Sequence, residues 1–349
     1  MKKRLGNVLC AVLAVAGLWL IMPESVHAYT VDIHGYGNQD FMSADKNQYL
    51  GAKGGTWEQH SMSLIFTAGV TDDTTVWARL HHDADTEATV DWLYVTKKLR
   101  PDVEVRVGQI KFPLGIYNLY AENKFLEISE LEPMMYSPNV DHMIFDVLDG
   151  VDIEYSGTVG LELFGGANHV ETNVLAKNVL GARIPWKTPI EGLNLIASGT
   201  LFTQETTSTA SGLVSSQKLK LLVVSVDYVN HGLDLKAELA KKIMAGNDEM
   251  DKMSVLSYYV QAGYLVLDRW TPYVRYDILY ADQHQKSDPS FYQKEATVGL
   301  AYLINSYLKV KAEEHFVNGY NVPVQSGEVA PGEGANHWHL FVTGVDFIF

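Results

Sequence analysis

The last stretch of the sequence, residues 337–349, reads HWHLFVTGVDFIF and alternates two kinds of side chain. From His339 to Phe349 the odd positions are mostly aromatic or aliphatic, whereas the even positions include Gly344 and Asp346. Successive side chains of a strand point to opposite faces. A strand with Phe on one face and Gly and Asp on the other is typical of a barrel that has lipid outside and water inside.

The N-terminal segment has the features of a secretory signal peptide. Basic residues 2–4 precede an almost wholly apolar stretch at 7–22, and small residues stand at the cleavage-proximal positions within 26–28. The alternative is a membrane-anchor helix, but the apolar stretch is short for a span and no cluster of charges follows it. We therefore expect residues 1–28 to be cleaved on export, so that the mature chain begins at Tyr29.

Composition argues against several classes of function. Cys10 is the only cysteine and lies in the predicted signal peptide, so the mature chain offers no disulfide, thiol nucleophile or thiolate metal site. The formal net charge of −15, without a basic patch, argues against a nucleic-acid partner. After Tyr29 no apolar run reaches the length of a membrane helix, so any membrane crossing must be made by strands. No cofactor is predicted.

The mature chain repeats strand-like segments, separated in turn by short and long connections. Two-residue alternation bounded by turn residues indicates a strand in each segment. The pattern predicts one domain, 29–349: an all-β, sixteen-stranded antiparallel transmembrane barrel with its short turns and both termini on the periplasmic side. A β-sandwich is the alternative, but no change in composition separates two domains. The predicted strands lie at about 29–40, 57–70, 76–81, 88–97, 103–111, 151–155, 159–163, 179–186, 193–204, 218–229, 233–244, 253–266, 271–281, 292–304, 307–318 and 337–349.

Aromatic side chains near the ends of the predicted strands fit the two interfacial girdles of such a barrel. In the fourth strand we assign Val90, Trp92 and Tyr94 to the outer face and Asp91 to the inner face. A soluble β-protein would instead use such aromatics as a packed core. The further aromatic residues assigned to apolar faces near strand ends are Tyr258, Tyr264, Tyr276, Tyr280, Tyr302, Phe347 and Phe349.

The regular alternation stops after the fifth predicted strand, between Phe112 and Asp149. This stretch contains Pro113, Pro133 and Pro138 together with a series of acidic residues. A connection of this length inside a compact domain is usually functional. We therefore expect the stretch to contribute to the site of function.

The entrance to this connection, RVGQIKFPLGIYN at 106–118, resembles the RVGQxKxPxG stretch of the bacterial porins grouped with the phosphate-selective porins O and P. The residues DGVDIEY at 149–155 are also similar to that group, and the terminal Phe349 resembles the end of bacterial outer-membrane proteins. The resemblance implies an outer-membrane porin that is a homotrimer and lets small hydrophilic solutes diffuse passively. It also implies a constriction loop, at about 112–149, that folds into the barrel.

The predicted register places charges of both signs on the inner face of the barrel. Acids of the loop that face bases of the wall would set a transverse field across the constriction. The alternative is that about half of these acids are simply solvated. The predicted pore-lining residues are Arg79, Arg106, Lys111, Glu122, Lys124, Glu127, Glu130, Glu132, Asp141, Arg183, Arg275, Lys309 and Lys311. Further charged residues assigned to the inner face or the loop are Asp91, Glu104, Asp146, Asp152, Glu154, Glu162, Asp234, Lys236, Asp277, Glu313 and Asp346.

The balance of these charges bears on selectivity. An anion channel needs Arg and Lys along its path. Because acidic residues are at least as frequent here, phosphate selectivity is not carried over from the resemblance, and a cation preference is the hypothesis. A substrate-specific channel for phosphate or another small anion is the alternative.

Catalytic and metal-binding interpretations have weaker support. His81 and His82 point to opposite faces of a strand, and His337 and His339 share a face without a third ligand at a fixed spacing. No serine lies in a nucleophile-elbow context, so a barrel hydrolase is a minor alternative, as is a soluble secreted β-protein. We predict a channel, not an enzyme, with outer-membrane lipid and small hydrophilic solutes as partners.

Overall fold

The computed structural model describes residues 30–349 except 85–86, 120–122, 138–143, 145, 172–173, 209–210 and 246–252. The predicted signal peptide lies outside the described residues, as do Glu122 and Asp141 of the predicted constriction loop. None of the helices among the described residues has both the length and the apolar character that a membrane span requires.

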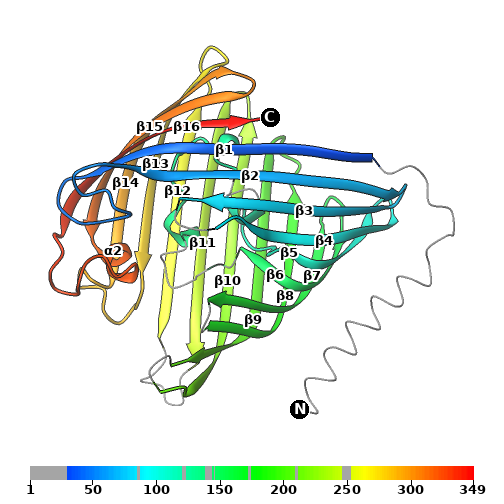
Figure 1. The fold of residues 1–349 in the computed structure, drawn as a ribbon, viewed down its shortest axis with the longest axis horizontal. Coiled ribbons are helices and arrows are strands. Elements are labelled where there is room, and N and C mark those ends of the chain that lie inside the picture. Colours follow the sequence, from blue (N-terminus) through cyan, green and yellow to red (C-terminus); the bar gives the residue numbers. More distant parts are fainter. Residues whose placement is uncertain are drawn as a thin grey trace.

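The strands form one closed barrel in which each strand pairs antiparallel with its neighbours in the sequence, and β1 pairs with β16 (Figure 1). The predicted sixteen-stranded antiparallel barrel is therefore confirmed. The strands are β1 Thr30–Ala44, β2 Thr56–Thr71, β3 Thr74–Asp83, β4 Thr89–Arg100, β5 Val103–Lys111, β6 Val147–Tyr155, β7 Leu161–Glu171, β8 Val174–Lys187, β9 Leu193–Thr207, β10 Val214–Asn230, β11 Leu233–Ala245, β12 Ser254–Tyr264, β13 Trp270–Tyr280, β14 Tyr292–Asn305, β15 Leu308–Gly319 and β16 His337–Ile348.

Short and long connections leave opposite ends of the barrel. The connection from β2 to β3 and that from β10 to β11 are tight turns, whereas those from β1 to β2 and from β15 to β16 are long. The β15–β16 connection carries the short helix α2, Asn321–Gln325. The barrel closes at the short-turn end, where Gly35 and Phe349 exchange two backbone hydrogen bonds of 2.9 Å each.

Side chains alternate between the two faces of the wall as the sequence pattern predicts. In β16, Trp338, Val342 and Asp346 are buried, whereas Phe341 and Val345 between them are exposed on the outer face. Large apolar side chains are likewise exposed along the outer faces of the other strands. An apolar outer face is what a hydrocarbon environment requires of a barrel.

The face assigned to Trp92 and Tyr94 is wrong. The pairing of β3 with β4 shifts by one residue beside Asp91, so that Arg79 faces Trp92 while Leu80 faces Val90. An extra residue in one strand exchanges the faces of all residues beyond it. Val90 is exposed as predicted, but Trp92 is buried and Tyr94 packs against the interior.

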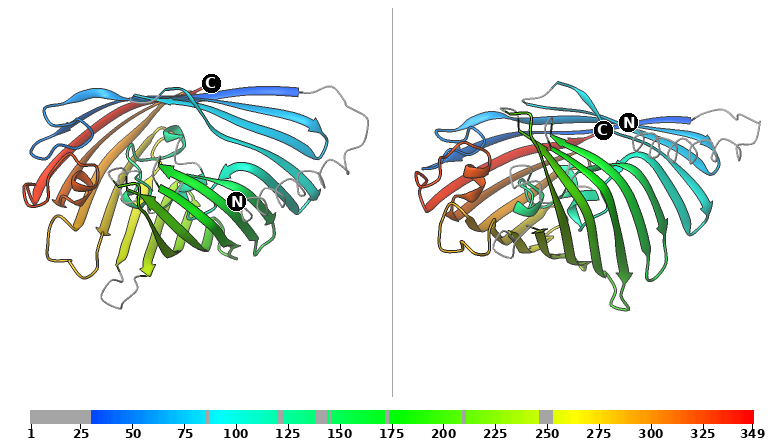
Figure 2. Two further views of the ribbon diagram at one scale, coloured as in Figure 1. Left: turned by 60° about the horizontal axis from the view of Figure 1, so that its bottom comes forward. Right: turned by 90° about the horizontal axis from the view of Figure 1, so that it is seen from below.

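The segment between β5 and β6 lies inside the ring of strands (teal in Figure 2). We call its described residues, 112–119, 123–137, 144 and 146, the inner segment. It contains the short 3₁₀ turns η1 (Tyr117–Leu119), η2 (Lys124–Leu126) and η3 (Met134–Tyr136).

The inner segment packs on the wall through an apolar core, so the barrel is not water-filled throughout. Phe112 and Tyr117 of the segment belong to one buried cluster with Phe164 of β7 and Leu221 and Val223 of β10. Between Leu221 and Val224, β10 is apolar on both faces, of which the inner one is buried and the outer one is exposed. Polar residues of β2, β3 and β4 line a cavity beside the inner segment.

Candidate functional site: the inner segment and the cavity beside it

The first part of the inner segment contacts Glu238 of β11, a buried carboxylate that accepts several hydrogen bonds. It accepts hydrogen bonds from the backbone N–H of Ile116 at 2.8 Å and the hydroxyl of Tyr136 at 2.6 Å. The hydroxyls of Ser225 and Tyr259 on the wall donate to it at 2.5 Å and 2.9 Å. Glu238 therefore joins the entrance of the inner segment to the wall opposite β5.

Two lysines of β15 hold the far part of the inner segment by its backbone. Lys311 Nζ donates to the carbonyl oxygen of Lys124 at 2.6 Å and to that of Ser129 at 2.9 Å. Lys309 Nζ donates to the carbonyl oxygen of Glu127 at 3.1 Å. The two lysines are two positions apart on one strand, so they share a face, and their contacts with the inner segment show that it is the inner face.

The same stretch of backbone is held from the next inner-face position of β15. The Glu313 carboxylate accepts hydrogen bonds from the backbone N–H of Glu130 at 3.0 Å and of Leu131 at 2.8 Å. Arg275 of β13 donates to the carbonyl oxygen of Leu131 at 2.6 Å. Wall side chains therefore satisfy both donors and acceptors of a segment with little secondary structure of its own.

His315 supports Glu313 from behind. Its Nε2 lies 2.9 Å from a Glu313 oxygen and its Nδ1 lies 2.6 Å from an oxygen of Glu295 on β14. Both contacts are hydrogen bonds when the imidazole carries a proton on each nitrogen. All three side chains are buried, so the cationic ring offsets the two carboxylates.

Three buried carboxylates meet where the inner segment touches β1 and β16. Oxygens of Asp40, Glu130 and Asp346 lie within 4.8 Å of one another, a spacing that could suit a metal ion. Two ammonium groups already lie there: Lys124 Nζ is 2.5 Å from Asp40, and Lys311 Nζ is 2.9 Å from Asp346. The group is therefore a buried ion-pair network. Burial lowers the pKa of Lys124, but Asp40 and Glu130 raise it more, so it lies above its ordinary value.

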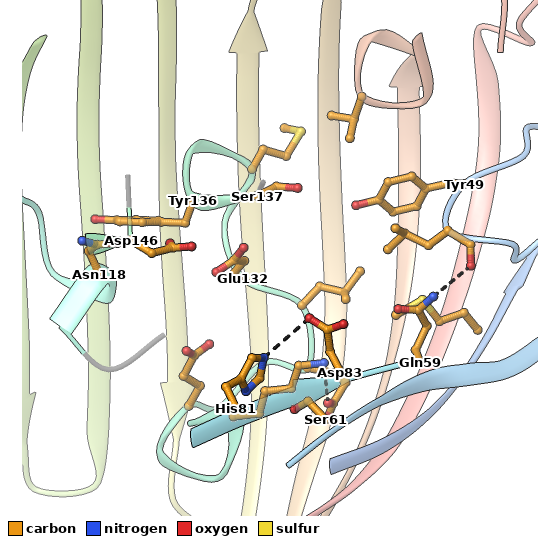
Figure 3. A pocket seen from close by; sticks show the side chains of 18 of the residues that line it. Tyr49, Gln59, Ser61, His81, Asp83, Asn118, Glu132, Tyr136, Ser137 and Asp146 are labelled. Atoms are coloured by element: carbon orange, nitrogen blue, oxygen red, sulfur yellow. Dashed lines mark hydrogen bonds and ion pairs between the residues drawn. The ribbon is translucent and has the colours of Figure 1, made fainter. Parts of the chain in front are cut away.

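A cavity of about 570 Å³ lies between the inner segment and the wall of β1 to β4 (Figure 3). Ser61 of β2 and His81 and Asp83 of β3 line it from the wall. Glu132 and Tyr136 line it from the inner segment. This cavity is the candidate passage, because on the side of β7 to β11 the inner segment packs on the wall through the apolar core.

Acidic side chains outnumber basic ones around the cavity. Burial raises the pKa of the Glu127 carboxyl to about 8, although Lys311 and Lys124 act to lower it. Glu127 therefore carries little charge at neutral pH. The acidic lining residues are Asp83, Asp91, Glu127, Glu130, Glu132, Asp146 and Glu295, and the basic ones are Arg79, Lys111 and Lys124.

A second charged cluster lies on the inner wall nearer the short turns, around Arg106. The Arg106 guanidinium contacts Asp152 at 2.8 Å and Glu162 at 3.1 Å, and it also pairs with Glu104 and Glu154. Arg183 adds one further base, 3.4 Å from Glu162. Acids again exceed bases, so this part of the wall is also negative.

The structure distributes the predicted pore-lining residues over distinct places. Lys309, Lys311 and Arg275 contact the inner segment directly and do not face it across open space, so the expected transverse field does not arise from them. Arg79 does line the cavity, but its guanidinium lies 2.6 Å from Asp91. The predicted residues around the cavity are Arg79, Lys111, Lys124, Glu127, Glu130 and Glu132; Arg106 and Arg183 form the second cluster.

Sequence reasoning missed several anchors of the inner segment. Glu238 is in phase with Lys236, which was assigned to the inner face, and His315 is in phase with Lys311 and Glu313. The register alone could therefore have placed both side chains inside. The partners of Glu238 on the inner segment could not be identified, because Ile116 lies 122 positions away and Tyr136 lies 102 positions away.

Ser63, His81 and Asp83 have the order of a hydrolase triad but not its geometry. Ser63 Oγ lies 2.9 Å from His81 Nδ1, and His81 Nε2 lies 3.5 Å from Asp83. Arg79 Nη2 also lies 2.9 Å from His81 Nδ1, and its Nε donates to Ser63 Oγ at 3.0 Å. Arginine only donates, so Nδ1 is occupied as an acceptor and cannot take a serine proton. Ser63 is also completely buried.

Solved structures resemble this chain in fold, whereas the comparisons of sequence find no match. No protein-family model matches the chain, and no curated protein matches it. OmpT of Vibrio cholerae in its trimer form is 12% identical, with a TM-score of 0.63 over 93% of this chain and 100% of that chain. The anion-selective porin from Comamonas acidovorans is 12% identical, with a TM-score of 0.64 over 92% and 100%.

Salmonella typhi OmpF, solved in complex with daunomycin, is also 12% identical, with a TM-score of 0.63 over 91% of this chain and 97% of that chain. These likenesses extend over nearly the whole of both chains in each case. At such low identity they establish the architecture alone. The chain has the barrel fold of these outer-membrane proteins.

Proposed function

We propose that this protein is an outer-membrane porin through which small hydrophilic solutes and ions diffuse passively. The observation that carries the proposal is the closed barrel, apolar outside, with a charged cavity between its wall and the inner segment. The porin folds of the solved structures support it. In this role the inner segment is the constriction, and no covalent chemistry is needed.

We infer a preference for cations over anions. The support is the excess of carboxylates around the cavity and around Arg106, which attracts cations and repels anions. A channel for phosphate or another small anion, as the O and P group would suggest, has less support because Arg79 and Arg106 are both paired with acids. The general porin is therefore the form of the proposal that we favour.

We also propose that the protein forms a homotrimer and is exported through a signal peptide. A homotrimer is supported by the trimer form of the similar Vibrio cholerae OmpT. Export through a signal peptide at 1–28, with the mature domain at 29–349, is supported by the basic and apolar pattern of the N-terminus. The proposed constriction residues are those that line the cavity from the inner segment.

The test is conductance in planar lipid bilayers. Full-length protein is expressed, extracted from the outer-membrane fraction in detergent and added to bilayers under a tenfold KCl gradient. We expect stepwise conductance and a reversal potential of the sign that cation preference gives. Heat-denatured protein from the same preparation is the control. Absence of steps contradicts the porin proposal, whereas steps with anion preference contradict only the selectivity.

A further inference from the structure

Three lysines lie close together on the outer face of the barrel, near the end of the barrel that carries the long connections. Lys218 and Lys220 belong to β10, and Lys241 belongs to β11. All three are exposed. We call them the outer lysine patch. A lysine on the outer face of a membrane barrel destabilises the barrel near the bilayer midplane but costs little free energy near the edges of the bilayer. We therefore expect these lysines to lie near an edge of the bilayer.

The strand register brings the three ammonium groups together. Lys218 and Lys220 are two positions apart and therefore share a face, at a spacing of roughly 7 Å. Lys241 is paired with Leu222, so it is a diagonal neighbour of Lys220 on the same face. Three ammonium groups thus lie within reach of one multivalent anion.

The patch is not neutralised by the part of the chain that the structure describes. Among the described residues, no side chain forms a hydrogen bond or an ion pair with the ammonium group of any of the three lysines. Lys177 on β8, two strands away from β10, differs because it is paired with Glu205 of β9. The outer lysine patch therefore carries positive charge that no described side chain neutralises.

The patch lies at a boundary between charged and apolar surface. Going along β10 away from the long connections, Lys218 and Lys220 are followed on the same face by Leu222, Val224 and Val226, which are all exposed. Aliphatic side chains suit acyl chains, and lysine stems reach upward to a headgroup. The boundary corresponds to the edge of a hydrocarbon layer.

We propose that the outer lysine patch binds the phosphate groups of a lipid in the leaflet that faces the long connections. Ammonium groups bind phosphate oxygens as point charges with strong hydrogen bonds. The acyl chains of the same lipid lie on Leu222 and Val224. The proposal rests on the membrane location in the proposed function and adds a specific lipid contact to it.

The test compares two triple variants of the full-length protein. The first, Lys218→Gln, Lys220→Gln and Lys241→Gln, removes the patch. The control, Lys98→Gln, Arg100→Gln and Lys187→Gln, removes the same charge from exposed positions at the short-turn end. Delipidated protein is titrated with diphosphoryl lipid A, monophosphoryl lipid A or phosphatidylcholine, and bound lipid is counted by native mass spectrometry.

We expect wild-type protein and the control to bind diphosphoryl lipid A more tightly than the monophosphoryl form, and phosphatidylcholine least. The patch variant should lose at least about tenfold in affinity for diphosphoryl lipid A, with phosphatidylcholine binding unchanged. Equal affinity of patch variant and wild type overturns the proposal, as does an equal loss in the control. A change of oligomeric state with unchanged lipid binding assigns the patch to a subunit contact and overturns it too.

Bilayer conductance of the same proteins separates this inference from the proposed function. The outer lysine patch is on the opposite side of the wall from the cavity, so the patch variant should keep the wild-type conductance. If wild-type protein does not conduct, the proposed function fails whatever the lipid result. If all variants conduct and bind lipid A equally, the lipid inference alone fails.

Discussion

The ammonium group of Lys311 lies 2.9 Å from the carbonyl oxygen of Ser129, so a strand residue holds the backbone of the inner segment directly. Glu313, the next inner-face residue of β15, accepts hydrogen bonds from backbone N–H groups of the same stretch. One strand therefore supplies both donors and acceptors to a segment that has little secondary structure of its own. We expect these contacts to hold the inner segment in place beside the cavity.

Replacing Glu313 with Gln should loosen the inner segment. The amide keeps one acceptor oxygen but turns an NH₂ group toward donors, including the Leu131 N–H at 2.8 Å. The substitution also removes the negative charge of Glu313, which offsets the buried imidazole of His315. We expect a loss of about 3 kcal/mol in the free energy of unfolding, measured by thermal unfolding in detergent. We also expect a larger and noisier single-channel conductance.

The neighbouring residue provides a matched control for this change. Glu314 lies on the outer face and pairs with His339 at 3.2 Å, with both side chains substantially exposed. Glu314→Gln should change the free energy of unfolding by less than about 1 kcal/mol and leave the conductance unaltered. If Glu313→Gln behaves like Glu314→Gln in both measurements, Glu313 does not hold the inner segment.

The strands could be predicted from the sequence because period-2 alternation is a local property. In β16 the exposed Phe341 and the buried Asp346 were assigned correctly from residue parity alone. The failure at Trp92 and Tyr94 has a local cause as well. A shift of pairing at Asp91 exchanges the faces, and the sequence does not show where such a shift occurs.

The interior could be predicted only in part. The inward direction of Lys311 followed from the register, but its partner Ser129 lies 182 positions away, and a pattern of alternation contains no such pairing. The apolar core was visible in principle, because β10 carries Leu221 and Val223 on one face and Leu222 and Val224 on the other. A strand that is apolar on both faces indicates a second covered side.

The raised pKa of Glu127 gives the stability of the protein a specific dependence on pH. Burial holds this carboxyl at a pKa of about 8, against an ordinary value of 4.5. The folded state therefore binds a proton that the unfolded state releases between these values, so this contribution is complete below about pH 4.5 and is lost as the pH rises to about 8. The contribution is on the order of 5 kcal/mol.

Glu127→Gln tests this dependence because the amide resembles the protonated acid. At pH 4 the variant and the wild type should unfold at similar temperatures, and at pH 9 the variant should be the more stable of the two. Thermal unfolding in detergent at both pH values gives the comparison. Glu314→Gln should follow the wild type at both. A wild-type advantage over Glu127→Gln at pH 9 would contradict the assignment.

Glu132 and Asp146 should contribute to cation preference, because both line the cavity from the inner segment (Figure 3). Removing both charges in Glu132→Gln, Asp146→Asn should lower the ratio of cation to anion permeability by a factor of about two to five. The reversal potential in a KCl gradient measures this ratio. Glu314→Gln removes a charge outside the barrel and should leave it unchanged. An unaltered ratio in the double variant would exclude these two carboxylates from the passage.

The contact between β6 and β7 requires two glycines that face each other, Gly150 and Gly166. A Cβ atom on Gly150 would lie 2.1 Å from the carbonyl oxygen of Gly165, and one on Gly166 would lie 2.1 Å from that of Asp149. Both obstacles are backbone atoms, so no side-chain rotation relieves them, and the two strands must move apart just where the inner segment rejoins the wall.

Gly150→Ala should therefore destabilise the barrel by about 1–3 kcal/mol, measured as a lower unfolding temperature in detergent. Gly69→Ala in β2 is the matched control, because its added methyl group meets only the side-chain oxygen of Thr30, at 3.2 Å. That oxygen can turn away, so the control should stay within about 0.5 kcal/mol of the wild type. Equal unfolding temperatures for the two variants would show that β6 and β7 can separate at this point without cost, and that their close approach is not what fixes the exit of the inner segment.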